Sequence, residues 1–375
     1  MRRDGTPRIL KPAVLLAGLL IGLLNSALPA DARPPADPPR RIEIAATPIT
    51  HFDPRDATRQ RFGALTFIGG LQLTSPDKQF GGLSGLSLSP DGQHMLSLSD
   101  RGRWFRGRIV YRDGRPAGIA DAETAPILGA GGRPLAAQRR FDTEALSRAD
   151  SMLYVGIERA NEIMRFDDRR GGLTARGEPL AVPPAIKALP HNRGLEALVA
   201  IPRGARHTAL AGALIAMSER GLDADGNITG FILPGSRQRP AATFAVKRRD
   251  GYDISDAALL PDGDLVILER FFSFTRGLAM RIRRIAIGAV KPGALVDGPV
   301  LIEADMGYQI DNMEGIAAHR AETGDTVLTL VSDDNFLFIQ RTILLQFRLA
   351  EPPAGQPILT DQPSLTGQPM PTDLR

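Results

Sequence analysis

The chain contains no cysteine among its 375 residues. This absence excludes structural disulfides, thiolate metal sites, a cysteine nucleophile and lipid attachment at a signal-peptide cysteine. Aromatic residues make up only 5% of the chain, and its basic residues are scattered among acids rather than gathered in runs. A nucleic-acid-binding surface is therefore not predicted.

Local catalytic motifs are missing as well. The sequence has no phosphate-binding glycine loop, no dinucleotide fingerprint and no His-x-x-x-His metal pair. The segment Gly82-Leu-Ser84-Gly85 is not a nucleophile elbow, because its glycine spacing is wrong and a strand pattern rather than a helix follows it. No serine-centred motif thus supports acyl-enzyme chemistry.

Long apolar runs are absent except at the N-terminus, where one run spans residues 13–24. Basic side chains precede the run, and Ala30-Asp31-Ala32 offers a small-x-small cleavage site. The run is shorter than the roughly 20 residues that a spanning helix needs. We expect residues 1–32 to be a Sec-type signal peptide cleaved near Ala32, with an uncleaved anchor as the alternative. The protein would then be periplasmic or secreted, with no membrane span after cleavage.

A short strand-like unit recurs five times in the remaining sequence. Each copy opens on an acidic or hydroxyl residue, turns back and closes on an acidic residue. The copies open at Ser84, Glu144, Glu196, Ser255 and Glu314, and they close at Asp100, Glu158, Glu219, Glu269 and Asp333. Successive copies begin 52 to 60 residues apart. Such a period predicts a stacked or radial array of one supersecondary unit.

The repeated units read as β-hairpins. In two of them, alternating apolar and small polar residues flank the turn triplets Pro90-Asp91-Gly92 and Pro261-Asp262-Gly263. No segment after residue 32 shows a sustained 3.6-residue apolar period. The predicted fold is all-β, and four short strands per unit are typical of a β-propeller blade.

We expect one propeller domain over residues 46–350, between a Pro-rich linker at 33–45 and a disordered tail at 351–375. Its length suits six blades, with seven as the alternative. The sixth blade would combine the region before Ser84 with the strand Ile343–Leu349, so that strands from both chain ends close the ring.

Hairpin geometry predicts where the repeated acids lie. In an antiparallel pair joined by a tight turn, the start of the first strand and the end of the second share one edge of the sheet. The opening and closing acids should therefore lie on one face of the disc, with Asp256 paired to Glu269 in the fourth copy. If the first strands line the channel, carboxylates ring its mouth.

Two interpretations of this ring remain open. The acids could cap strand ends and pair with the arginines that follow several of them. Alternatively, converging carboxylates could be neutralised by a bound cation, and hard oxygen ligands favour Ca²⁺. The metal-ligand candidates are Glu144, Glu196 and Glu314, followed by Asp100 and Asp333.

The loops before these strands supply candidates for substrate binding. His191 is the only histidine beside a repeated glutamate, and Arg159 and Arg220 directly follow closing acids. The two arginines could bind phosphate oxygens and His191 could protonate a leaving group. As a surface loop residue, His191 could equally have no catalytic role.

Taken together, the repeats resemble the bacterial phytase-like family, known for an "esterase-like activity of phytase". The resemblance covers about Phe80 to Leu349. The matching segments are Gly81–Leu86, Ser97–Gly102, Asp142–Leu146, Asn192–Ala197, Ser218–Gly221 and Asn312–Ile316. It implies an exported β-propeller that hydrolyses phosphate esters with calcium.

The leading hypothesis is accordingly a monomeric Ca²⁺-dependent phosphoester hydrolase that acts on a small anionic or ester substrate. In this hypothesis the ring carboxylates hold the metal, which activates a water, while arginines clamp the phosphate. The alternatives are a non-catalytic binding or scaffold propeller of the cell envelope and a lactonase-type or esterase-type propeller.

Overall fold

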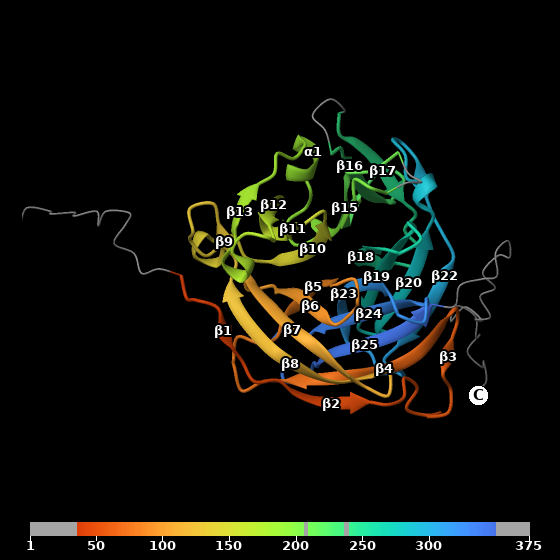
Figure 1. Cartoon of the computed structure of the whole chain (residues 1–375). Coiled ribbons are helices and arrows are strands. Elements are labelled where there is room, and N and C mark those ends of the chain that lie inside the picture. Colours follow the sequence, from red (N-terminus) through yellow and green to blue (C-terminus); the bar gives the residue numbers. More distant parts are fainter. Residues whose placement is uncertain (1–35, 206–208, 236–239, 350–375) are drawn as a thin grey trace, which may run out of the picture. The chain divides into compact units, whose positions relative to one another are not determined.

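Five sheets surround a common axis in the computed structural model, which describes residues 36–205, 209–235 and 240–349 (Figure 1). Each of the five repeats supplies the innermost strands of one sheet. This confirms the predicted all-β propeller. The expected signal peptide at 1–32 and tail at 351–375 lie outside the described residues.

The first three sheets each contain five strands. From the axis outward, the first consists of β5 (Leu83–Leu88), β6 (His94–Ser99), β7 (Arg103–Arg112), β8 (Arg115–Pro126) and β1 (Arg40–Arg41). The second consists of β10 (Thr143–Ala149), β11 (Met152–Ile157), β12 (Glu162–Asp167), β13 (Arg176–Pro179) and β9 (Leu128–Gly129). The third consists of β14 (Leu195–Ala200), β15 (Leu214–Leu222), β16 (Ile228–Leu233), β17 (Ala242–Val246) and β21 (Leu295–Val296).

The fourth sheet is the smallest, and the fifth draws strands from distant parts of the chain. The fourth contains β18 (Asp253–Leu259), β19 (Leu265–Ser273), β20 (Gly277–Ile285) and β22 (Val300–Asp305). The fifth contains β23 (Asn312–Arg320), β24 (Thr326–Asp333), β25 (Thr342–Leu349), β4 (Leu65–Thr74) and β2 (Ala45–Ile49), with β3 (Arg61–Phe62) paired to β4.

Helices are minor features of the described chain. The single α-helix there is α1 (Pro184–Lys187), and short 3₁₀ turns occur at Ala136–Gln138, Glu158–Ala160, Gly172–Thr174 and Ile287–Ala289. Within the described ranges, no helix has the length and apolar character needed to cross a bilayer.

The expectation of six blades is wrong, because the described residues form five sheets. The two segments assigned to a sixth blade do lie in one sheet, but that sheet belongs to the fifth repeat. There β25 pairs on one side with β24 and on the other with β4. The N-terminal strand therefore completes the fifth sheet rather than adding another.

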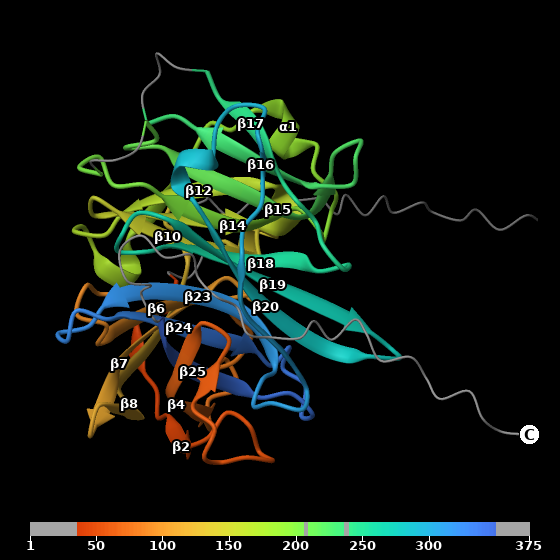
Figure 2. The ribbon, with the colours of Figure 1, turned by 90° about the vertical axis from the view of Figure 1, so that its right-hand side faces the viewer.

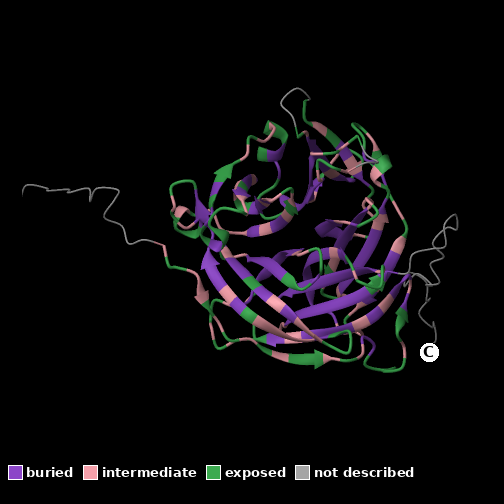
Figure 3. Ribbon diagram, viewed as in Figure 1, coloured by how far each residue is buried: buried purple, intermediate pink, exposed green. Residues whose placement is uncertain are grey.

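The apolar core lies between the sheets. Five clusters of buried side chains fill the five interfaces between neighbouring sheets, including the one between the fifth sheet and the first. The innermost strands contact one another in the order β5, β10, β14, β18, β23 and back to β5. Buried residues accordingly dominate the strands around the axis (Figure 3).

Candidate functional site

Every innermost strand contains a one-residue irregularity near its start. The pairing with the second strand of the same sheet skips one residue in each case. The skipped residues are Gly85, Glu144, Glu196, Ser255 and Glu314. Such β-bulges redirect a side chain away from the regular alternation of the strand. Three of the five bulges therefore carry a glutamate.

The first repeat has a glycine at this position for a steric reason. Gly85 has φ of +57°, and a Cβ there would lie 2.8 Å from the backbone nitrogen of Leu146. The neighbouring sheet thus leaves no room for a side chain at the bulge. The first repeat therefore places no side chain at the bulge itself, although the neighbouring Ser84 of β5 reaches Glu144.

Six acidic side chains gather at this end of the channel, and we call them the carboxylate cluster. Its members are Glu144, Glu158, Glu196, Glu219, Glu314 and Asp333. They come from three sheets, and each lies close enough to others of the cluster for mutual repulsion. The repeat thus concentrates negative charge at one channel mouth.

Burial and repulsion favour the protonated forms of these groups. Burial raises the pKa of Glu158 to about 7, with repulsion from Glu219 adding to the effect. Burial also raises the pKa of Glu314 to about 7, although Arg270 counteracts it. The pKa of Asp333 rises to about 8, again mainly through burial and then through Glu314. For Glu196, burial followed by repulsion from Glu144 places the pKa well above its ordinary value.

One guanidinium group lies inside the carboxylate cluster. Arg270 donates to Asn312 Oδ1 at 2.7 Å and to Glu219 Oε1 at 3.2 Å, and it also pairs with Glu314. Asn312 Nδ2 in turn donates to Glu314 at 2.9 Å. Burial alone would lower the pKa of Arg270. The negative charges of Glu314 and Glu196 have a larger, opposite effect, so the pKa of Arg270 is raised. A single cation therefore faces several carboxylates.

The sequence analysis did not identify Arg270 as a site residue. It placed Glu269 in the ring, but in the fourth sheet Ile254 is opposite Glu269 and Ser255 is the bulge residue. Arg270 therefore occupies the place that Glu158 or Asp333 takes in other repeats. Because side chains alternate along a strand, this one-residue difference turns Glu269 to the other face. A serine where other repeats have glutamate was the available signal.

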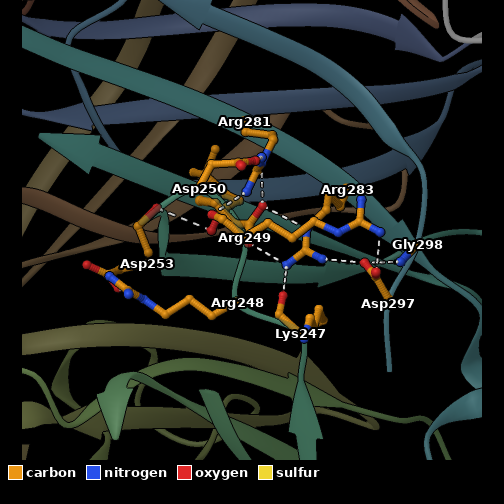
Figure 4. A network of polar contacts seen from close by, with 12 residues as sticks. Lys247, Arg248, Arg249, Asp250, Asp253, Arg281, Arg283, Asp297 and Gly298 are labelled. Atoms are coloured by element: carbon orange, nitrogen blue, oxygen red, sulfur yellow. Dashed lines mark hydrogen bonds and ion pairs between the residues drawn. The ribbon is translucent and has the colours of Figure 1, made fainter. Parts of the chain in front are cut away.

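Glu269 instead belongs to a buried ion-pair network within the fourth sheet (Figure 4). It accepts hydrogen bonds from Arg281 Nε at 2.9 Å and Arg283 Nε at 2.8 Å. Asp256, its expected partner in the ring, is fully buried and accepts from the backbone N–H of Ile316 at 2.8 Å. Glu269 therefore lies outside the carboxylate cluster, whereas Asp256 lies close enough to Glu314 to repel it.

The other predicted metal ligands lie at or near the carboxylate cluster. Glu144, Glu196, Glu314 and Asp333 are members of it. Asp100 lies in the turn after β6, where Ser99 Oγ approaches it at 3.2 Å and burial raises its pKa. Asp100 also lies close enough to Asp333 to repel it. The structure therefore brings these five predicted residues to one end of the channel.

The predicted substrate-binding residues occupy the rim, each with a partner. Arg159 lies 3.6 Å from Asp142 and its guanidinium stands 4.4 Å from the centre of the Phe141 ring. Arg220 pairs with Asp253, donating from Nε at 2.9 Å. His191 is exposed, and its Nδ1 lies 3.4 Å from the carbonyl oxygen of Arg159. Of the two arginines, Arg159 has the longer and weaker contact with its carboxylate partner.

The donor chemistry of the carboxylate cluster fits a hard cation. Carboxylate and amide oxygens are the ligands that Ca²⁺ prefers, and the cluster carries more acids than its one guanidinium can neutralise. Among the described residues, however, no three acidic, histidine or cysteine side chains converge as a ready-made metal site. A bound cation would have to draw the carboxylates closer together.

The opposite end of the channel differs in character. The far ends of all five innermost strands and their turns surround a cavity of about 850 Å³ there. Leu86, Leu146, Val199 and Ile316 form part of its wall, and His319 lies at its edge. Among the described residues that line this cavity, the acids are Asp150 and Asp262.

Comparisons of three-dimensional structure show distant similarity to several solved proteins. The PQQ-bound aldose sugar dehydrogenase from Streptomyces coelicolor has 13% identity and a TM-score of 0.38, covering 74% of this chain and 97% of that one. The α-L-arabinofuranosidase from Podospora anserina, in complex with cellotriose, has 12% identity and a TM-score of 0.44, covering 74% and 94%. The RRP9 WD40 repeats have 9% identity and a TM-score of 0.36, covering 82% and 100%.

Sequence comparison is more specific. No curated protein matches the chain. The profile of the phytase-like family, described as "Esterase-like activity of phytase", matches residues 78–336. This region runs from just before the first repeat to just after the last one, and it includes the whole carboxylate cluster. The chain therefore belongs to the phytase-like family.

Proposed function

We propose that this phytase-like propeller is an exported Ca²⁺-dependent phosphoester hydrolase that acts at the carboxylate cluster. The observation that carries the proposal is the charge imbalance at the channel mouth, where six acids from three repeats gather around the guanidinium of Arg270. Buried like charges are costly unless cations, protons or hydrogen bonds compensate them. A divalent cation supplies that compensation and suits phosphoester chemistry.

The residues that would hold calcium are Glu144, Glu196, Glu314 and Asp333, with Asp100 beside them. When bound there, calcium would polarise a phosphoryl oxygen and lower the pKa of a bound water. Arg270 holds Glu314 and Asn312 in place through its guanidinium and limits the net charge of the mouth. In the metal-free protein Arg270 therefore compensates these carboxylates, and it would compete with calcium for them.

The chain's own side chains would handle the substrate at the rim. Arg159 is half-exposed and only loosely paired with Asp142, so its guanidinium can donate hydrogen bonds to a phosphate oxygen. Arg220 would have to exchange its pair with Asp253 to do the same. Two groups could protonate the leaving group. His191 is exposed at the rim, whereas Glu158 is buried and fixed by the N–H of Gly194 at 2.9 Å.

Export to the periplasm or medium is part of the proposal. It rests on the basic, apolar and small-residue pattern of residues 1–32. The expected cleavage near Ala32 can be checked by N-terminal sequencing of protein recovered from an expressing bacterium. Recovery of an uncleaved chain from the membrane fraction would contradict it.

The hydrolase proposal is tested with the mature protein, first treated with EDTA and then supplied with Ca²⁺. We expect thermal unfolding to shift upward with calcium, as binding to the native state requires, and an aryl phosphate to be hydrolysed only with calcium. Glu196→Gln and Glu314→Gln should abolish both effects. Glu178→Gln, an exposed carboxylate paired with Arg165 on β13, is the matched control and should behave like the parent.

The scaffold alternative is favoured by one observation, the lack of a preformed metal cage among the described residues. A scaffold would show no turnover of either an aryl phosphate or an aryl ester, and the Glu196→Gln variant would change stability alone. A lactonase-type or esterase-type propeller would hydrolyse the aryl ester faster than the aryl phosphate. Calcium-independent stability together with absent turnover would contradict the hydrolase proposal.

A further inference from the structure

Two hairpin tips carry large apolar side chains into solvent. At the β19–β20 hairpin, Phe272 near the end of β19 is 63% exposed and Phe274 in the turn is 99% exposed, and their rings contact each other at 5.6 Å between centroids. In the loop between β24 and β25, Phe338 is 99% exposed and Ile339 is 72% exposed. Leu337 beside them is also exposed. We call these loops the first and second apolar tips.

Both tips leave the molecule at the end that carries the carboxylate cluster. Arg270 precedes Phe272 by two residues and bonds to Asn312, which pairs with Asp333 at the end of β24. The second tip follows directly after Asp333. Figure 2 shows the β19–β20 hairpin projecting past the neighbouring strands. The strand β19 continues three residues beyond Arg270, or about 10 Å at the usual rise per residue.

The two tips share a charge pattern. Their sequences are Phe271-Phe-Ser-Phe-Thr-Arg276 and Phe336-Leu-Phe-Ile-Gln-Arg341, so each combines several apolar residues with one arginine. Asp334 lies just before the second segment, and Arg341 at its end lies 3.5 Å from Asp311. Arg276 lies over the Phe271 ring at 4.7 Å, and Arg101 lies over the Phe336 ring at 3.2 Å. Arginines therefore stand at the bases of both tips, beneath the exposed rings.

We propose that the two apolar tips dock this face of the propeller onto an anionic lipid bilayer. Convex, separate protrusions tipped by aromatic and aliphatic groups insert among lipid chains without needing a complementary partner surface. Arginines below the rings lie at the depth of the headgroups and complement their negative charge. Aromatic side chains are enriched at this boundary for the same reason.

Docking in this orientation turns the carboxylate cluster toward the headgroups, so the cluster's repulsion of an anionic surface opposes the attraction of the tip arginines. The proposal does not depend on catalysis, because it rests on the exposure and charge of loop residues outside the cluster. Failure of the hydrolase proposal would leave it intact, and the reverse also holds.

The test is co-sedimentation of the mature protein with phosphatidylcholine vesicles, with and without phosphatidylglycerol. We expect binding to the anionic vesicles and weak binding to the neutral ones. The double variant Phe274→Ser and Phe338→Ser should lower partitioning at least about tenfold, because two fully exposed aromatic rings are lost from the contact. Arg276→Gln should weaken binding to the anionic vesicles only.

The matched control is Leu295→Ser, which removes an apolar side chain of 54% exposure from the edge strand β21. All the changed positions are exposed, so the variants should melt like the parent. Equal binding by the double variant and the control would overturn the proposal. So would equal binding to neutral and anionic vesicles, or self-association in solution that the double variant abolishes.

Discussion

The carboxylate of Glu269 and the carboxylate cluster at the channel mouth are both largely buried, but they differ in how their negative charge is balanced by arginines. Glu269 is fully buried between Arg281 and Arg283, whose side chains are 2% and 0% exposed. The carboxylate cluster at the channel mouth has Arg270 alone. Both groups arise from the same repeated strand pair. Each repeat supplies acids near its strand ends, but the number of neighbouring arginines decides whether those acids form a fully paired network or a crowded, repelling cluster.

Further contacts complete the network around Glu269. Arg283 also reaches Asp297 at 2.6 Å and the carbonyl oxygen of Lys247 at 2.9 Å, and Arg281 reaches Asp250 at 2.8 Å (Figure 4). Nearly every donor of these two guanidiniums therefore has an acceptor. A buried network satisfied to this degree is rigid and specifies one packing arrangement.

The largest expected effect comes from breaking the satisfied network. Glu269→Gln leaves two buried guanidiniums without their shared counter-charge, so we expect a loss of roughly 3 kcal/mol in the free energy of unfolding. Urea denaturation measures this. The exposed pair of Arg106 and Glu123 provides the reference, and Glu123→Gln should cost less than about 1 kcal/mol. Similar costs for the two variants would contradict the comparison.

The second prediction concerns pH and the metal-free protein. In the folded state the pKa values of Glu158 and Glu314 are about 7 instead of the ordinary 4.5, and that of Asp333 is about 8. Between pH 4.5 and 8 the folded protein therefore binds more protons than the unfolded chain, and stability falls as pH rises. We expect a loss of several kcal/mol between pH 5 and pH 9, because each unit of pKa shift corresponds to about 1.4 kcal/mol.

Urea denaturation in EDTA across that pH range measures the effect. Calcium should flatten the profile, because a bound cation replaces the lost protons as compensation. A metal-free protein whose stability rises steadily from pH 5 to pH 9 would show that the carboxylates are not held in their protonated forms.

The third prediction sharpens the contrast by removing Arg270, the guanidinium that pairs with Glu219 and Glu314. Arg270→Gln leaves Glu219 and Glu314 without their partner and should destabilise the metal-free protein by roughly 2 kcal/mol. It also removes a competitor for the carboxylates, so calcium should bind about tenfold more tightly. Isothermal titration calorimetry measures the affinity. Unchanged calcium affinity would show that Arg270 and the cation do not share ligands.

The smallest effect is expected for Glu196→Gln in the absence of metal. The change removes one repelling charge from a crowded site, so stability should stay equal or rise by about 1 kcal/mol. This sign is opposite to that of Glu269→Gln, although both variants replace a buried glutamate with glutamine. A loss of several kcal/mol would place Glu196 in a satisfied network that resembles the one around Glu269.

The sequence predicted the elements that depend on local pattern. The five hairpin repeats identified the innermost strands, and the edge rule for antiparallel pairs placed Glu144, Glu196 and Glu314 at one end of the channel. Both inferences hold because strand period and hairpin geometry are local properties. The existence of an acidic mouth followed from them.

Features that depend on register and long-range pairing could not be predicted. In the fourth repeat the bulge falls at Ser255. With this register, the side chain of Arg270 rather than that of Glu269 points to the channel mouth. The alternation of apolar residues does not encode where a bulge occurs. The blade count was wrong for a related reason, since the pairing of β4 with β25 joins segments from opposite ends of the chain.

That last pairing has a consequence for how the protein folds. Leu65 of β4 is opposite Leu349 of β25, so the fifth sheet forms only after nearly the whole chain is available. The entropy of closing so long a loop grows slowly with length, but contacts of this range slow folding markedly. The protein should therefore fold slowly, after synthesis is complete. Once β25 has paired with β4, the fifth sheet links segments from near both ends of the described chain. Neither end can then detach without disrupting this sheet, so unfolding should be slow and cooperative.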